Sequence, residues 1–441
     1  MKRLLSLLLC AVLALFCATT AQAAGVSITL TASEYALHYA FDAGAQDPFV
    51  ILEYTTPAEK GWMMLYSADG HFEGDVSLAY SGAGGKTSVA LTSARTTGSI
   101  GKASTTLPKA ADYQKPTGKS NAKVTDFVLT ETPEGFHYAF NAIGTDYMLL
   151  YWRSKEQTVT QPVYPDENGH YEGDVISDLT FARTQFTVQV KSGAGSMKKE
   201  ATVRKGYQAP EAPQRQEGRL SGVTVCIDAG HQENGRFVNE PIGPGLSGST
   251  SGKGGMAQGT KTNRRESIVC LEIGMLLRDE LLRQGANVVM TREDQTTFHT
   301  NIERCEIAEA GGAQIMLRLH CNNSSNRSKR GIQVYGPLNS DYAKAVADAD
   351  TYREMGQKLL DAMKTRVGIT LANSTGMVRL NDNYVGNNWA KMMCFLVEMG
   401  YLSNPAEEYL LVTPVYQQWL AEGMADGVYE IAVARGWVQA Q

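Results

Sequence analysis

An internal repeat in the N-terminal half is the feature that most restricts the architecture of this 441-residue chain. The segment His38–Ala43 has the sequence HYAFDA and returns at His137–Ala142 as HYAFNA. A second motif, GHFEGDV at Gly70–Val76, returns as GHYEGDV at Gly169–Val175, with the same offset between the copies. Self-similarity at a fixed period indicates repeated structural units. The sequence therefore predicts two copies of one domain, followed by a different C-terminal half.

Each copy has the pattern of a small all-β unit. Short segments of alternating apolar and polar residues, such as Ser27–Thr31 and Phe186–Val190, are separated by Gly, Asp, Asn and Ser. Alternation with a period of two is typical of strands with one buried face, and closely spaced turn residues favour a β-sandwich. We predict sandwich-like repeats at residues 24–116 and 120–210, followed by a polar linker at residues 211–219.

The two copies contain four of the seven histidines of the chain, namely His38, His71, His137 and His170. A histidine beside an aromatic residue on a strand usually belongs to a cross-strand pair. Duplication copies structural residues as faithfully as binding residues, so the structural role is favoured. A metal or sugar site in the repeats is the alternative.

The first 23 residues have the features of a secretory signal peptide. Lys2 and Arg3 provide the positive start, an apolar run extends from Leu4 to Cys17, and Ala21-Gln22-Ala23 is a small-x-small cleavage pattern. The run is too short to span a bilayer, and no later segment is long and apolar enough. We therefore expect an exported protein without a transmembrane segment.

Charge and cysteine usage argue against two further classes of protein. The net charge is −5, and removal of Lys2 and Arg3 makes the mature chain more acidic, which argues against nucleic acid as a partner. Two of the seven cysteines lie in the leader, and the other five, from Cys226 onward, show no paired spacing. We therefore expect buried small residues instead of a disulfide framework.

The C-terminal half alternates strand-like and helix-like patterns, which predicts an α/β domain over residues 220–441 with a central sheet flanked by helices. Val223–Ile227 is a short β-branched run typical of a buried strand, and His231 follows it in the tight turn Asp-Ala-Gly-His. This turn places the imidazole at the carboxyl edge of a sheet, where α/β proteins usually carry out their chemistry.

Three later residues occupy comparable positions. Glu266 opens a predicted helix, His320 ends an apolar run, and Glu398 lies in an apolar strand that breaks at Gly400. Two histidines and one carboxylate from separate element ends form the pattern of a catalytic zinc ion with a fourth position open for water. Glu398 is then free to act as a base.

Ordered blocks in this half resemble a known family. In chain order they are IDAGH, the glutamate that opens a helix, VVMTRED, LRLHCNNS, RGIQVYGP and FLVEMGYLSN. The set is similar to the zinc-dependent N-acetylmuramoyl-L-alanine amidases of the amidase-3 family, which cleave bacterial peptidoglycan, over roughly residues 223–437. The resemblance implies that His231, Glu266 and His320 bind one zinc ion and that Glu398 is the catalytic glutamate.

Four further residues are candidates for substrate-side or supporting roles. Asn322 follows the second histidine, and Trp389 resembles the family's substrate-side segment. Arg292 resembles a family position, and a structural role in an internal ion pair is favoured for it. Asp228 either orients the ring of His231 or bonds backbone amides in its turn, and the residues leave both roles open.

Two positions depart from the family pattern. Gln232 stands where glycines often follow the first histidine, and Arg318 stands where a small residue is common two positions before the second histidine. Neither change removes a ligand, but both leave the substrate side open. The segment Gln232–Thr262 has no apolar period and lies between two proposed ligands, so we expect it to border the site.

Three classes of function are compatible with these residues. The first is a secreted, cell-wall-associated autolysin that uses zinc-activated water to cleave the amide between N-acetylmuramic acid and L-alanine. The second is a zinc peptidase that acts within the stem peptide, because the same metal chemistry would serve. The third is a non-catalytic wall-binding protein, against which the intact ligand set argues. The β repeats are candidates for binding the wall polymer, with a spacer as the alternative.

Overall fold

The structure is a computed structural model of the chain, and it forms two compact units. The first unit is Met1–Asp178 with Gln185–Lys205, and the second is Leu179–Thr184 with Gly206–Gln441. The residues described are 19–21, 26–34, 36–45, 47–78, 82–96, 98–111, 122–132, 135–143, 148–153, 158–163, 165–176, 184–192, 197–205, 211–232, 238–250, 256–262, 264–368 and 377–440.

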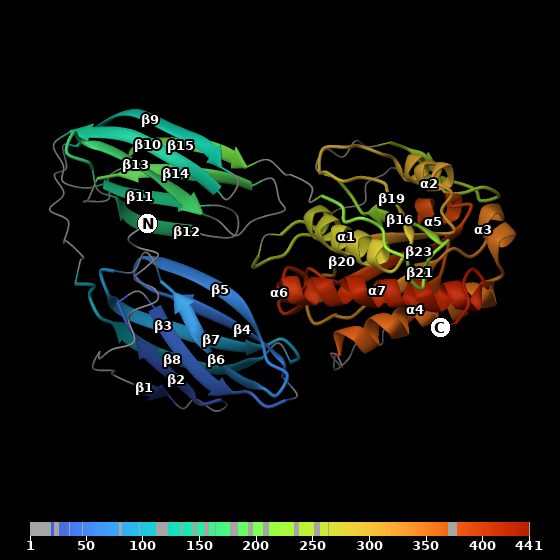
Figure 1. Cartoon of the computed structure of the whole chain (residues 1–441), viewed down its shortest axis with the longest axis horizontal. Helices are drawn as coiled ribbons and strands as arrows, with labels where there is room; N and C mark the ends of the chain where they lie inside the picture. Colours follow the sequence, from blue (N-terminus) through green and yellow to red (C-terminus); the bar gives the residue numbers. More distant parts are fainter. Residues whose placement is uncertain are drawn as a thin grey trace. The chain divides into compact units, whose positions relative to one another are not determined.

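Antiparallel strands make up the first unit, and no helix occurs among its described residues (Figure 1). The strands are β1 (Thr19–Ala21), β2 (Ile28–Ala32), β3 (Ala36–Asp42), β4 (Phe49–Thr55), β5 (Glu59–Tyr66), β6 (His71–Ser77), β7 (Gly85–Ser93), β8 (Ser99–Leu107), β9 (Lys123–Thr132), β10 (Gly135–Ile143), β11 (Met148–Arg153), β12 (Thr158–Val163), β13 (His170–Ile176), β14 (Thr184–Lys191) and β15 (Met197–Lys205). The all-β prediction for this region is thereby confirmed. The sandwich form of each copy stays a prediction.

The two copies share one sheet. Two smaller sheets have the orders β1-β2-β3-β6 and β13-β10-β9. The third sheet runs β15-β14-β11-β12-β5-β4-β7-β8 and therefore takes strands from both copies. Antiparallel pairing of Thr158 with Lys60 and of Val159 with Glu59 joins β12 to β5. Strand β1, which pairs with β2, lies inside the predicted signal peptide.

Cross-strand packing explains the repeated glycine of each copy. Tyr138 on β10 pairs with Gly173 on β13, and a Cβ at Gly173 would lie 2.7 Å from the Tyr138 hydroxyl oxygen. The first copy repeats this contact, because a Cβ at Gly74 would lie 2.7 Å from the hydroxyl oxygen of Tyr39. A tyrosine ring therefore covers each glycine, which is how an aromatic residue compensates for a missing side chain in a sheet.

Cross-strand pairs also account for the repeated histidines. His38 Nδ1 lies 3.0 Å from Asp75 Oδ1, and these two residues are register partners on β3 and β6. The second copy repeats the pair with His137 and Asp174, at 2.9 Å. The other two pairs are His71 with Asp42 and His170 with Asn141. The predicted cross-strand pairing of these histidines is confirmed.

The Tyr–Gly contact makes a stability prediction. Gly173→Ala should lower the free energy of unfolding by about 1–3 kcal/mol, because the added methyl group displaces the buried Tyr138 ring. Gly98→Ala is the control and should change stability little, since its Cβ would make an ordinary contact of 3.5 Å with Thr96 Oγ1. Denaturant unfolding measures both. Equal effects of the two substitutions would contradict this account of the repeated glycine.

The second unit is a six-stranded sheet between helices. Its sheet strands are β16 (Thr224–Ala229), β19 (Asn287–Met290), β20 (Ile315–Asn322), β21 (Gln333–Gly336), β22 (Met377–Leu380) and β23 (Met393–Tyr401), and β17 (Glu240–Pro241) pairs separately with β18 (Ser249–Thr250). The helices are α1 (Glu266–Arg283), α2 (Asn301–Ala310), α3 (Asp341–Val346), α4 (Ala349–Val367), α5 (Val385–Trp389), α6 (Glu407–Leu411) and α7 (Pro414–Ala434). No helix of the described residues has the length and apolar character needed to span a membrane.

Alternate residues of the strands face two helical layers. Cys226, Met316 and Cys394 are aligned on β16, β20 and β23 and pack against α2 through Cys305 and Ala308. On the other face α1 and α4 contact the strands, and α7 packs on both of these helices. The prediction of a central sheet flanked by helices is confirmed. The five cysteines of this unit are all buried and free, as expected.

Parallel pairing sets the position of the site. The sheet order is β19-β16-β20-β23-β21-β22, and β16, β20 and β23 are adjacent and parallel. Their carboxyl ends therefore meet at one edge of the sheet. Residues that follow β16 or end β20 and β23 are brought together there, although they lie far apart in the sequence.

Candidate metal centre

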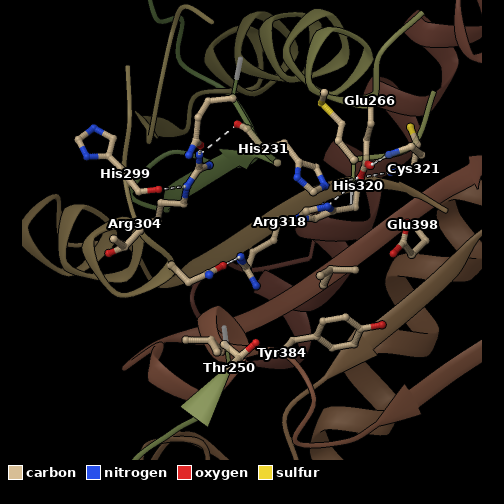
Figure 2. A pocket seen from close by; sticks show the side chains of 18 of the residues that line it. His231, Thr250, Glu266, His299, Arg304, Arg318, His320, Cys321, Tyr384 and Glu398 are labelled. Carbon is tan, nitrogen blue, oxygen red and sulfur yellow. Dashed lines mark hydrogen bonds and ion pairs between the residues drawn. The ribbon is translucent and has the colours of Figure 1, made fainter. Parts of the chain in front are cut away.

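Three side chains from different elements converge at this edge: His231 after β16, Glu266 at the start of α1 and His320 on β20 (Figure 2). Glu266 Oε1 lies 3.1 Å from His231 Nε2 and 2.9 Å from His320 Nδ1. Ligand atoms in a tetrahedral site with bonds of about 2.1 Å are about 3.4 Å apart. The three groups therefore have the chemistry and the spacing to hold a metal ion such as zinc.

The backbone turn after β16 presents His231. This residue has φ 58°, which is the left-handed region that a non-glycine residue adopts at a cost of about 1–2 kcal/mol. Gly230 before it donates its N–H to the carbonyl oxygen of Leu319 at 2.9 Å. A Cβ at Gly230 would lie 2.4 Å from that oxygen and 2.6 Å from the His320 ring. The glycine thus lets the two imidazoles approach each other.

Hydrogen bonds hold the buried carboxylate of Glu266 in place. Its Oε2 accepts from the backbone N–H of Ala257 at 2.7 Å, and its Oε1 accepts from that of Cys321 at 3.1 Å. Burial alone would raise the pKa of Glu266, but hydrogen bonds with the two imidazoles outweigh the burial and hold the pKa below its ordinary value. Glu266 therefore stays a carboxylate and can serve as a ligand.

Glu398 lies beside this group on the neighbouring strand. It is the register partner of His320, and its buried Oε2 has no hydrogen-bond partner within the part of the chain that the structure describes. Burial raises the pKa of Glu398 to about 8, and the charge of Glu266 adds to the effect. A bound cation would act in the opposite direction. An unpartnered carboxyl group next to three potential ligands is suited to exchanging a proton with a water molecule there.

A pocket of about 590 Å³ opens over these residues. Residues of the segment between the first two ligands line part of it, among them Val238, Glu240, Thr250 and Met256. The expectation that Gln232–Thr262 borders the site is confirmed for its described residues. His299 also lines the pocket, although no strand end or motif marks it in the sequence.

Asp228 is fully buried between two arginines. It accepts hydrogen bonds from Arg304 and, at 2.9 Å, from Arg318, and it also accepts one from Thr291 at 2.8 Å. Neither the ring of His231 nor a backbone amide is among these partners, so its contacts differ from both roles considered for it. Burial would raise the pKa of Asp228, but the two guanidiniums outweigh it and hold the pKa well below the ordinary range.

Of the remaining candidates Asn322, Arg292 and Trp389, only Asn322 is among the residues that line the pocket. Asn322 lines it and donates from its side chain to Gln333. Arg292 donates to backbone carbonyls, including that of Ser267 at 2.7 Å. The indole N–H of Trp389 donates to the carbonyl oxygen of Pro241 at 2.9 Å, which attaches the loop that follows His231 to helix α5. Substrate-side roles for Asn322 and Trp389 stay predictions, as does the internal ion pair expected for Arg292.

The buried arginine–aspartate cluster makes a prediction. Asp228→Asn should lower the free energy of unfolding by about 3–5 kcal/mol, because it leaves two buried guanidiniums with too little negative charge. The carboxylate stabilises the fold at pH values above its unfolded pKa of about 3.9, and this stabilisation is lost as the pH falls below that value. The free energies of unfolding of the wild type and the variant should therefore converge in acid. Denaturant unfolding at several pH values measures the difference.

The control is Asp279→Asn. This aspartate pairs with the buried Arg278, but its own side chain is 37% exposed, so the loss should stay below about 1 kcal/mol. If both substitutions lowered the free energy of unfolding by similar amounts, the burial of Asp228 between its arginines would not be what makes it important for stability.

Comparison with known proteins identifies the second unit. Residues 225–430 match the family model of N-acetylmuramoyl-L-alanine amidase. The germination-specific N-acetylmuramoyl-L-alanine amidase of Bacillus subtilis is 26% identical over 231 residues, covering 49% of this chain and 83% of that protein. The probable cell wall amidase LytH of Staphylococcus aureus is 27% identical over 218 residues, covering 48% of this chain and 60% of LytH.

A solved structure is also similar to this half of the chain. The N-acetylmuramoyl-L-alanine amidase from Clostridium difficile 630 is 24% identical, and the match covers 49% of this chain and all of that one, with a TM-score of 0.39. The matched residues of this chain include His231, Glu266, His320 and Glu398 within the family segment. The C-terminal half of this chain, over residues 225–430, belongs to the N-acetylmuramoyl-L-alanine amidase family.

Proposed function

We propose that this protein is a zinc-dependent peptidoglycan hydrolase that cleaves the amide between N-acetylmuramic acid and the first L-alanine of the stem peptide. The observation that carries the proposal is the convergence of His231, Glu266 and His320 beside the unpartnered carboxyl group of Glu398. This arrangement lies within a domain whose family is named for that reaction.

His231, Glu266 and His320 would hold the ion at the pocket that all three of them line. A zinc ion bound there supplies Lewis acidity for the scissile carbonyl and lowers the pKa of a bound water. The backbone N–H groups of Ala257 and Cys321 fix the orientation of the Glu266 carboxylate. The protein thus contributes a rigid ligand set before substrate arrives.

Glu398 would move the proton at its Oε2 atom. It accepts a proton from the attacking water and then donates a proton to the departing amine nitrogen, as a general base followed by a general acid. None of the described residues hydrogen-bonds to Oε2, and burial favours the protonated form that the second step needs. The same residue can therefore serve both halves of the reaction.

The N-terminal unit and residues 1–23 bear on where the protein acts and on how it binds the cell wall. Residues 1–23 support secretion, and the amidase family supports action at the cell wall. We place the protein outside the cell in association with peptidoglycan, where the duplicated β region would add affinity for the polymer through its two copies. A protein that only binds the wall would have no need of the complete ligand set with Glu398.

The ligand assignment predicts the metal content. The purified protein should contain one zinc ion per chain, and His231→Ala or His320→Ala should remove it, because the remaining ligands bind metal poorly. Inductively coupled plasma mass spectrometry gives the occupancy. His299→Ala is the control, since this residue lines the pocket outside the ligand set and should keep the zinc. Full occupancy in both ligand variants would refute the assignment.

The proton-transfer role predicts a loss of turnover without a loss of metal. Glu398→Gln keeps the shape of the side chain but removes its basicity, so turnover should fall by about 100-fold or more while zinc content is unchanged. Glu309→Gln is the control, because this half-exposed carboxylate pairs with Lys391 and should leave turnover intact. If the Glu398 variant kept wild-type turnover, Glu398 would not be the residue that transfers the proton.

Product analysis tests the reaction itself. Digestion of purified cell walls should release peptides with new L-alanine amino termini and leave peptide-free glycan, which mass spectrometry distinguishes. No new reducing sugar should form, because glycoside cleavage requires two carboxyl groups placed across the bond. If new amino groups appeared on a diamino acid or on D-alanine instead, the protein would be a peptidase that acts within the stem peptide.

A further inference from the structure

The strained turn at His231 is held by two buried arginines. The three consecutive carbonyl groups of Ala229, Gly230 and His231 point to guanidinium N–H groups that come from elsewhere in the fold. Arg292 follows β19, and Arg304 lies in α2. Both arginine side chains are buried, with exposed fractions of 3% and 4%.

Arg292 donates hydrogen bonds to the chain just beyond the point where β16 and β19 stop pairing. Strand β19 pairs with β16 as far as Ile227, and the backbone N–H of Thr291 donates to the Ile227 carbonyl at 3.1 Å. Beyond that point Arg292 Nε donates to the Ala229 carbonyl at 2.7 Å, and Nη2 donates to the Gly230 carbonyl at 2.8 Å. The side chain therefore replaces the backbone donors that a longer β19 would have supplied.

Arg304 reaches the same turn from the other side. Its Nη1 donates to the Ala229 carbonyl at 2.9 Å, and its Nη2 donates to the carbonyl of His231 itself at 3.1 Å. Asp228 fixes the Nη1 end, and the side chain of Gln232 accepts from Nη2. Arg304 thus contacts every residue of the turn except Gly230, which Arg292 contacts.

The two departures from the family pattern belong to this network. Gln232 accepts from Arg304, and Arg318 shares Asp228 with Arg304. Arg318 itself donates to Asp228 and to Asn301, and not to a carbonyl of the turn among the contacts described. Arg318 therefore contacts the turn only through Asp228, whereas Arg304 and Arg292 hold the backbone.

We propose that Arg292 and Arg304 are positioning residues that hold the left-handed backbone of His231 so that its imidazole faces Glu266 and His320. The inference rests on the proposed metal site and extends it to two residues outside the ligand set, of which Arg304 also lines the pocket. Planar guanidiniums suit this task because each presents several donors in a fixed geometry, which the single ammonium group of lysine does not.

Zinc affinity of the full-length protein tests the inference. Metal-free protein is titrated with zinc against a chromophoric chelator, and thermal unfolding of each metal-free variant is recorded alongside. Arg304→Lys keeps the charge beside Asp228 but loses the paired carbonyl contacts, so the zinc dissociation constant should rise by about 10- to 100-fold. Arg292→Lys should have the same effect, which provides a second variant if one of the two does not fold.

Two further arginines serve as controls. Arg318→Lys alters the same charge cluster, and Arg278→Lys alters a buried arginine of α1 whose described partner is Asp279. Both should lower the unfolding temperature but keep the zinc dissociation constant within about threefold. If all four variants lose stability alike with unchanged zinc affinity, the arginines are only structural and the inference is overturned. If the wild-type protein does not bind zinc, the proposed function fails first.

Discussion

Parallel pairing of β20 with β16 on one side and β23 on the other is the constraint on which the site depends. Because parallel neighbouring strands end at the same edge of the sheet, His231, His320 and Glu398 lie close together there. They are far apart in the sequence. Helix α1 then starts at that edge and adds Glu266. A shift in the register of β23 by one residue would turn Glu398 to the opposite face of the sheet.

The sequence predicted the parts of this arrangement that follow from local pattern. The apolar run before His320 indicated a strand, and a helix begins at Glu266 as expected. The break expected at Gly400 is wrong, because the strand that holds Glu398 continues through this glycine to Tyr401. Alternation in the N-terminal half likewise predicted strands, and its repeated histidines form the cross-strand pairs that their aromatic neighbours suggested. Periodicity and turn chemistry are short-range properties, so a single sequence carries them.

Tertiary contacts were beyond the reach of the sequence. Arg304 lies in a helix without a motif, and its importance appears only when α2 is packed beside the turn at His231. Asp228 was considered as a partner of the imidazole or of backbone amides, but it binds Arg304 and Arg318, which are distant in the chain. Contacts of this kind depend on how the layers pack, which no periodicity encodes.

The sheet shared by the two β copies has a consequence for solubility. Strands β5 and β12 pair through Thr158 with Lys60 and Val159 with Glu59, so each covers N–H and C=O groups at one end of the other's edge. An open strand edge is a template for the addition of further chains. Duplication therefore allows one copy to shield the other from edge-to-edge aggregation, a protection that a single copy of this unit would lack at β5 or β12.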